Sequence, residues 1–162
     1  MSTPPTALSL AQLQQIASAG VPPSEHILNL LITMGDSEEE TRAWASDVLQ
    51  SVEVLPQDLA ASVAAKCLDP RPAVAAWACT LLGKLESDAT NYQVDIAACL
   101  NNHPSVSTRQ QAALALGVIA EHQLAGFEPA TLEALHHAAA SDDPRLKRLA
   151  AATLAMHEKH SS

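Results

Sequence analysis

A motif of seventeen residues occurs four times in this chain in degraded form, and this repetition constrains the fold more than any other feature. The clearest copy is D-P-R-P-A-V-A-A-W-A-C-T-L-L-G-K-L, from Asp69 to Leu85. The other copies begin at Asp36, His103 and Ser141, so successive copies start 33, 34 and 38 residues apart. When the first residue is counted as slot 1, slot 10 holds alanine and slot 14 holds leucine in every copy. A period of this size is typical of stacked supersecondary units that bury their apolar faces against one another.

The composition favours helices. Apolar residues make up 48% of the 162 residues but aromatic residues only 2%, so leucine, alanine, valine and isoleucine must fill the core. Alanine has the highest helix propensity and lets helices approach closely. The alternating β-branched runs that mark strands are absent. We therefore expect an all-α fold.

The repeats and the stretch before them predict an α-solenoid with a capping helix. Leu10, Leu13, Ile16 and Ala17 follow helical spacing, and Gly20 ends the pattern. Terminal units of solenoids are often atypical because one face meets water. The expected segments are a disordered N-terminus (1–6), a capping helix and its turn (7–23), a repeat array (24–157, with repeats 24–54, 55–87, 88–126 and 127–157) and a frayed tail (158–162).

The repeated motif resembles the second-helix signature of the HEAT repeat family. That signature has aspartate and proline at the turn, then valine, arginine, alanine and leucine at fixed offsets, often with a closing glycine. The copy from Asp69 matches it best, and H-P-S-V-S-T-R-Q-Q-A-A-L-A-L-G from His103 is similar. The copies from Asp36 and Ser141 are weaker. The resemblance covers residues 24–157 and implies an array of about four HEAT-like helix pairs.

The same resemblance implies a ladder of turn aspartates and slot-7 arginines along the array. In this chain the turn of the last two copies has lost its aspartate, and slot 7 of the second copy holds Ala75. We therefore expect a partial ladder that positions helix starts more than it stabilises them. Its expected members are Asp36, Arg42, Asp69 and Arg109.

The charge argues against nucleic acid as a partner. The net charge is −9, with 18 acidic and 9 basic residues, whereas a nucleic-acid binder needs a basic stripe that displaces counterions from phosphate. The only basic concentration is Arg145, Lys147 and Arg148, which we interpret as a solvated helix face, with an anionic partner site as the alternative. No apolar run approaches the ~20 residues of a membrane span. We expect neither nucleic acid nor membrane as a partner.

Residues that could carry chemistry form no catalytic pattern. The cysteines Cys67, Cys79 and Cys99 lie in helical apolar patterns without a C-x-x-C pair, which predicts small buried side chains in a reducing cytoplasm. A redox or metal role is the alternative. His157 and His160 are spaced to share a metal but stand in the expected tail. We expect no catalytic residue, no cofactor and no metal.

Three enzyme families with HEAT-like folds are the alternatives to a binding protein. Deoxyhypusine hydroxylases carry several His-Glu pairs that bind iron, and this chain has one such pair, His157-Glu158. Alkylpurine DNA glycosylases use a basic concave face, which the charge of −9 opposes. No motif excludes or supports a likeness to phycobilin lyases. A lyase-like enzyme, an enzyme accessory protein or an enzyme of unknown chemistry therefore stays open.

The second helices of the repeats predict a surface that binds another protein. Slots 5, 8, 12 and 16 point away from the first helix, and these slots are acidic in the first copy, small or apolar in the middle and basic in the last. An apolar centre with a polar rim is typical of protein contact surfaces. One alternative is that Leu114 and Val118 serve only to pack against a neighbouring repeat. The other is that Trp44 and Trp77, which both occupy slot 9, fill the space between adjacent repeats. The expected surface residues of this noncatalytic scaffold or adaptor are Ala73, Ala76, Thr80, Gln110, Leu114, Val118, Met156, Trp44 and Trp77.

Overall fold

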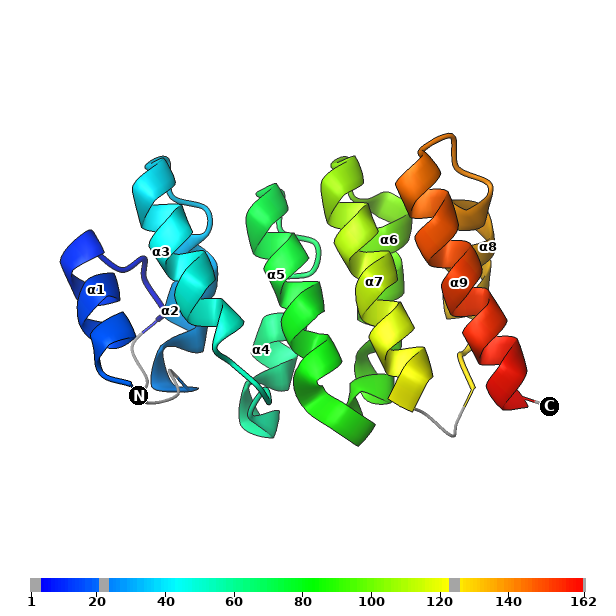
Figure 1. Ribbon diagram of the computed structural model, residues 1–162, viewed down its shortest axis with the longest axis horizontal. Coiled ribbons are helices and arrows are strands. Elements are labelled where there is room, and N and C mark those ends of the chain that lie inside the picture. Colours follow the sequence, from blue (N-terminus) through cyan, green and yellow to red (C-terminus); the bar gives the residue numbers. More distant parts are fainter. Residues whose placement is uncertain (1–3, 21–23, 123–125, 162) are drawn as a thin grey trace.

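The computed structural model describes residues 4–20, 24–122 and 126–161, and every regular element in these ranges is a helix (Figure 1). The prediction of an all-α fold is confirmed. Three of the elements are 3₁₀ helices: η1 (Ser24–His26), η2 (Gln57–Leu59) and η3 (Gly83–Tyr92). The α-helices are α1 (Leu10–Ser18), α2 (Ile27–Thr33), α3 (Glu39–Gln50), α4 (Ala60–Ala64), α5 (Pro72–Leu82), α6 (Gln93–Asn102), α7 (Val106–His122), α8 (Pro129–Ala139) and α9 (Pro144–Ser161).

The helices form two rows in an elongated molecule. α1, α3, α5, α7 and α9 lie side by side in one row, and α2, α4, α6 and α8 lie behind them (Figure 1). The N- and C-terminal ends lie at opposite ends of the rows. In the front row, α1 packs against α3, α5 against α7 and α7 against α9, whereas α3 and α5 make few or no contacts in the described residues and α5 contacts α2 instead.

The repeated motif sets the register of the front row. The helices α3, α5, α7 and α9 begin at Glu39, Pro72, Val106 and Pro144, and each of these residues is slot 4 of its copy. Equivalent slots therefore stand at equivalent heights along the four helices. This common register lets the slot pattern predict which side chains face the same side of the molecule.

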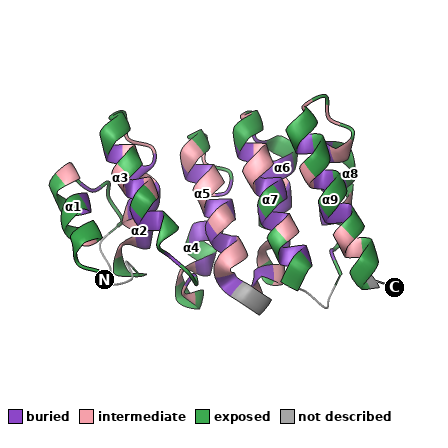
Figure 2. Cartoon of the chain, viewed as in Figure 1, coloured by how far each residue is buried: buried purple, intermediate pink, exposed green. Residues whose placement is uncertain are grey.

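The core is built from the slots that the motif keeps constant (Figure 2). Slot 10 holds four alanines that are fully buried, and slot 14 holds three fully buried leucines and Leu154, which is 9% exposed. Small side chains at slot 10 let the two rows approach, while the leucines fill the space between neighbouring helices. The aliphatic core that the composition requires is thus present.

The N-terminal helix has strong local signals at both ends. Ser9 caps α1 by accepting a hydrogen bond from Gln12 N–H, and the Gln12 side chain returns one to the Ser9 backbone. Gly20 has a φ of 68°, a left-handed conformation that glycine adopts without steric cost. α1 packs against α3 and so stands at the end of the front row. The expected turn at 21–23 lies outside the described residues.

Both chain ends differ in part from the expected disorder. Residues 1–3 lie outside the described residues, but Thr6 accepts a hydrogen bond from Asn29 Nδ2 at 3.0 Å. At the other end, α9 continues through Ser161, beyond the expected limit at residue 157. His157 stacks on Phe127 with ring centroids 5.3 Å apart, and this contact holds the last turns of α9 against the segment before α8.

Candidate partner-binding surface

The outward slots of the front row are accessible in the isolated chain. We call the residues at slots 5, 8, 12 and 16 of the four motif copies the stripe surface. They lie on α3, α5, α7 and α9, except that slot 16 lies just past the end of α3 and of α5. None of these residues is buried. They are Glu40, Ala43, Asp47, Ser51, Ala73, Ala76, Thr80, Lys84, Ser107, Gln110, Leu114, Val118, Arg145, Arg148, Ala152 and Met156.

The stripe residues of α5 are less exposed than those of α3 and most of those of α7. Ala73, Ala76, Thr80 and Lys84 are all half-buried, whereas the four stripe residues of α3 are all exposed and those of α7 mostly so. Three of these four α5 residues are small. We call the four half-buried residues the seat.

Two apolar side chains project from α7 next to this seat. Leu114 is 43% exposed and Val118 is 37% exposed, and their spacing of four residues places them one turn apart on one face of the helix. Val118 also lies close to the preceding repeat, since a Cβ atom at Gly83 would lie 3.9 Å from Val118 Cβ. Packing against a neighbouring repeat therefore covers only part of this pair.

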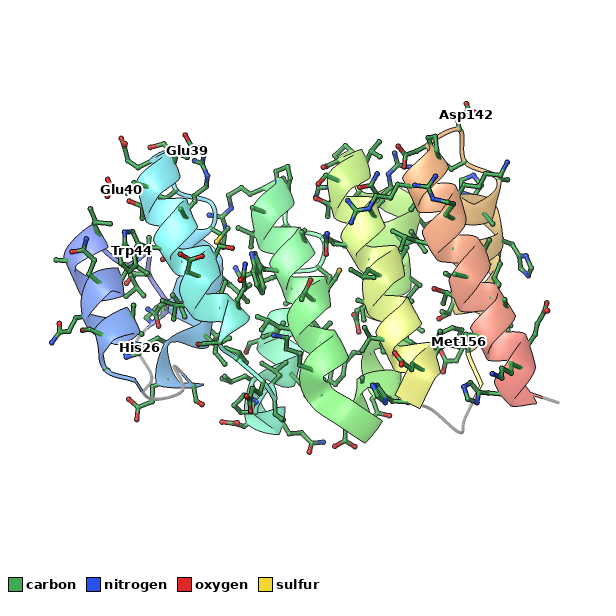
Figure 3. The ribbon with its side chains drawn as sticks, viewed as in Figure 1. His26, Glu39, Glu40, Trp44, Asp142 and Met156 are labelled. Atoms are coloured by element: carbon green, nitrogen blue, oxygen red, sulfur yellow. The ribbon has the colours of Figure 1, made fainter. Side chains whose placement is uncertain are left out.

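The stripe residues at the two ends of the surface carry opposite charges, and Figure 3 shows Glu39 and Glu40 at the start of α3 and Asp142 at the turn before α9. Glu39 and Glu40 are exposed in the first turn of α3, and Arg145 and Arg148 are exposed in the first two turns of α9. Asp143 lies near the basic side chains, but its Oδ2 accepts hydrogen bonds from Leu146 N–H at 2.7 Å and Gln110 Nε2 at 2.8 Å.

These hydrogen bonds define the role of Asp143 at the basic end. The bonds from Leu146 N–H and from Gln110, in that order, lower the pKa of the Asp143 carboxyl. Asp143 thus serves as the N-cap of α9 and as a link to α7. The guanidinium of Arg145 donates to Gln110 Oε1 at 3.4 Å, and Arg148 is an exposed side chain of α9.

The two tryptophans occupy the same slot of adjacent motif copies. Trp44 and Trp77 are both half-buried and pack against the core, and Figure 3 shows Trp44 on the side of α3 that faces α1. Each indole therefore packs against the core and keeps part of its surface accessible.

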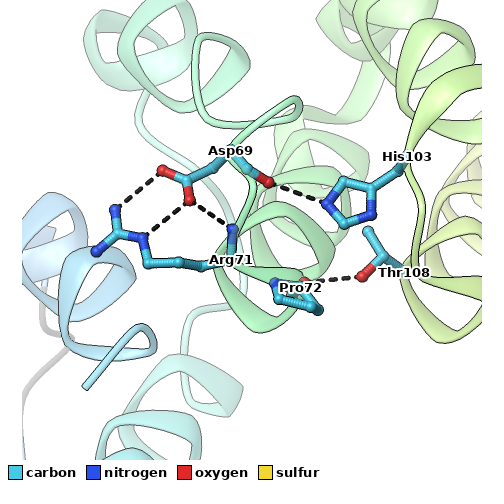
Figure 4. A network of polar contacts seen from close by, with 5 residues as sticks. All are labelled: Asp69, Arg71, Pro72, His103 and Thr108. Carbon is cyan, nitrogen blue, oxygen red and sulfur yellow. Dashed lines mark hydrogen bonds and ion pairs between the residues drawn. The ribbon is translucent and has the colours of Figure 1, made fainter. Parts of the chain in front are cut away.

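The bonds at the repeat turns differ from the expected aspartate–arginine ladder (Figure 4). Asp69 pairs with Arg71, at slot 3, through two contacts of 2.9 Å between Oδ1 and Nε and between Oδ2 and Nη2. The hydrogen bonds from Arg71 are the main reason that the pKa of Asp69 lies below its ordinary value. Arg42 binds the backbone carbonyl of Asp36 at 2.7 Å, and Nε of Arg109 is buried without a hydrogen-bond partner.

Backbone carbonyls accept the bonds that connect the second and third repeats. His103 Nε2 lies 2.9 Å from the carbonyl oxygen of Asp69, and Thr108 Oγ1 donates to the carbonyl of Pro72 at 2.9 Å. Ser105 N–H donates to His103 Nδ1 at 3.1 Å, so Nε2 carries the ring proton and donates to Asp69. The histidine that replaces the turn aspartate in the third copy thus makes the inter-repeat contact itself.

The three cysteines converge, which the sequence analysis did not predict. Cys67, Cys79 and Cys99 are fully buried free thiols, as expected from their apolar surroundings. Hydrogen bonding with Cys67, then with Cys99, and burial raise the pKa of the Cys79 thiol. Cys67 and Cys99 are 32 residues apart, close to one repeat period, and this spacing is the signal that could have placed them together. In the described ranges no group of three or more histidine, cysteine or acidic residues is arranged to hold a metal ion.

A hollow of about 610 Å³ lies between α1 and the end of α3. Its walls are mainly apolar, and the carboxylates of Asp47 and Glu53 and the hydroxyl of Ser51 line it as well. The motif offered no signal for this hollow, because it depends on how the N-terminal helix is seated. The residues that line it are Ile16, Ala17, Gly20, Ser24, Asp47, Val48, Ser51, Val52, Glu53 and Val54.

Comparison of the chain with models of protein families, with curated proteins and with solved structures gives no match. The resemblance noted from the repeated motif therefore rests on the residues quoted for it. Among the helices of the described segments, none combines the length and the apolar character needed to cross a membrane.

Proposed function

We propose that the chain is a HEAT-like α-solenoid of four helix pairs with a capping helix, and that it is a noncatalytic scaffold or adaptor. It binds another protein through the stripe surface. The common register of the four motif copies and the two-row packing support the solenoid. Three buried free thiols support a reducing location, which we propose to be the cytoplasm.

The observation that carries the binding role is the accessible apolar pair on α7. Leu114 and Val118 stand together beside the small side chains of α5, and charged residues lie at both ends of the same surface. The buried centre of a protein interface is depleted in charge, while its rim is polar. The net charge of −9 and the lack of a basic stripe support a protein rather than a nucleic acid as the partner.

A capture experiment with matched variants tests this role. The purified chain, the variant Leu114→Asp and the control Val94→Asp are immobilised and exposed to extract of the native host. Val94 is 45% exposed on α6, in the other row, so its substitution introduces the same charge away from the stripe surface. We expect the original chain and the control to capture the same protein and Leu114→Asp to lose it. Equal capture by all three chains would contradict binding through this surface.

An enzyme or enzyme accessory protein, of lyase-like or unknown chemistry, is the alternative function. The hollow between α1 and α3 is the observation that favours it, since carboxylates and apolar walls together can hold a small organic molecule. An absorption spectrum and a native mass spectrum of the chain purified from its host distinguish the two. A stoichiometric bound chromophore or small molecule would overturn the pure scaffold role.

A further inference from the structure

We propose that the stripe surface binds a second copy of this chain, in a face-to-face dimer with two-fold symmetry. This inference rests on the proposed function, because it names the partner of the same surface. The twofold axis would run parallel to the front-row helices and pass between α5 and α7. Rotation about this axis places α3 of one copy opposite α9 of the other, and α5 of one copy opposite α7 of the other.

The charges of the stripe surface complement themselves under this operation. Glu40 is the second residue of α3 and Arg145 is the second residue of α9, so both stand at the same height in the first turn of their helices. A twofold axis parallel to the helices keeps heights unchanged and places Glu40 of one copy opposite Arg145 of the other. A symmetric dimer contains this contact twice.

In the same arrangement, an exposed apolar side chain of one copy meets half-buried side chains of the other. Leu114 stands at slot 12 of α7, and slot 12 of α5 holds Thr80, which lies in the half-buried seat. The axis therefore places the exposed Leu114 of one copy over Thr80 of the other, beside the small side chain of Ala76. Each leucine then lies against the α5 seat of the other copy, and the apolar area that this contact removes from water favours association.

The charge pairs and the apolar pair contribute differently. Exposed ion pairs add little stability, but complementary charges orient two surfaces and speed their encounter. The leucines contribute apolar contact, which a homodimer interface needs at its centre. The arrangement predicts an association that weakens when salt screens the charged ends.

Self-complementarity is what favours a second copy over an unrelated protein. An isologous interface requires that one surface carry both members of every contact. Here one face carries acidic and basic residues at opposite ends, and it carries the exposed Leu114 and the half-buried Thr80 on either side of its middle. A head-to-tail arrangement would instead use the outer sides of α1 and α9, and it would continue into longer assemblies.

Charge reversal gives a decisive test by sedimentation equilibrium at a series of concentrations. One variant carries Glu39→Arg and Glu40→Arg, and the second carries Arg145→Glu and Arg148→Glu. Each variant alone should dimerise about tenfold more weakly than the original chain, because like charges then face each other at both ends. An equimolar mixture of the two should recover the original affinity as a heterodimer, and so should a chain with all four substitutions.

Matched controls separate this dimer from other outcomes. Glu133→Arg reverses one charge at an exposed site on α8, in the other row, and should leave dimerisation unchanged. Circular dichroism verifies that each variant is folded. Leu114→Asp should abolish the dimer without any change of the charged ends.

Three results would overturn the inference. The chain could remain monomeric at all concentrations, form assemblies that grow beyond a dimer, or form a dimer that charge reversal leaves unchanged. A monomer that still captures another protein through Leu114 would refute the dimer and leave the proposed function standing. Failure of Leu114→Asp to affect capture or dimerisation would refute both.

Discussion

His103 Nε2 lies 2.9 Å from the carbonyl oxygen of Asp69, and this bond joins the turns of the second and third repeats (Figure 4). The imidazole is 4% exposed, so a side chain without a donor at this position would leave the Asp69 carbonyl without its partner. The same ring accepts the N–H of Ser105. The bond therefore fixes both the local turn and the contact between repeats.

Replacement of His103 by alanine should destabilise the chain. The substitution removes both bonds and leaves buried polar groups unsatisfied, which costs about 1–3 kcal/mol of unfolding free energy. Urea denaturation followed by circular dichroism measures this loss. His136→Ala is the control, since His136 is exposed on α8. Equal midpoints for both variants would show that the bond adds no stability.

Replacement of Trp77 by alanine should cost more than replacement of Trp44. Both side chains pack against the core, but Trp77 stands inside the array while Trp44 faces the terminal helix α1. Loss of a large aromatic side chain costs about 3–5 kcal/mol when it is fully buried, and half-burial places Trp77 near the lower limit. Thermal unfolding of Trp77→Ala and Trp44→Ala measures the difference. An unchanged midpoint for Trp77→Ala, with loss of partner capture, would assign the indole to binding instead.

The ion pair of Asp69 predicts a loss of stability in acid. The pKa of Asp69 is lowered from its ordinary value of 3.8, chiefly by hydrogen bonding to Arg71. The folded state therefore binds this proton less readily than the unfolded state, so the pair stabilises the fold fully above pH 3.8. The contribution declines as the pH falls from there through the lower folded pKa. Asp69→Asn should abolish this part of the pH dependence in urea midpoints.

Asp142→Asn is the control for the acid prediction because Asp142 is an exposed side chain in the same type of turn. It should retain the pH dependence of the original chain. If Asp69→Asn retains it as well, the pair with Arg71 makes no contribution to stability in acid.

The three cysteines should be unreactive in the folded chain. Their side chains are fully buried, and the raised pKa of Cys79 keeps that thiol protonated at neutral pH. Ellman's reagent should label none of them in the native state within minutes and all three in denaturant. Rapid labelling of any one in the native chain, with the helical spectrum unchanged, would show that its environment opens to solvent.

Slots 10 and 14 show why much of the fold could be predicted from the sequence. Burial at these positions follows from a repeat period and helical spacing alone, and so does the accessibility of slots 5, 8, 12 and 16. The placement of Leu114 and Val118 on an open face belongs to this predictable part. The repeat period does not predict whether such a face binds a protein, because binding depends on the individual side chains that the face carries.

The turn bonds show what the sequence could not determine. The resemblance directed attention to slot-7 arginines, but Asp69 pairs with Arg71 two residues away, because the turn brings their side chains together. The contact of His103 with a carbonyl in the previous repeat depends on the tilt between units. The hollow beside α1 likewise depends on how one helix packs, which no spacing within the motif specifies.

Hydroxyl-radical footprinting of the chain, alone and with its captured partner or at high self-concentration, tests the central claim most directly. The method reports the solvent accessibility of individual side chains, and the stripe surface offers Leu114, Val118 and Met156 as probes, with Val94 on α6 as the control. We predict that the three probes become protected in the complex while Val94 stays reactive. Protection of Val94 with unchanged reactivity of the three probes would contradict binding through the stripe surface.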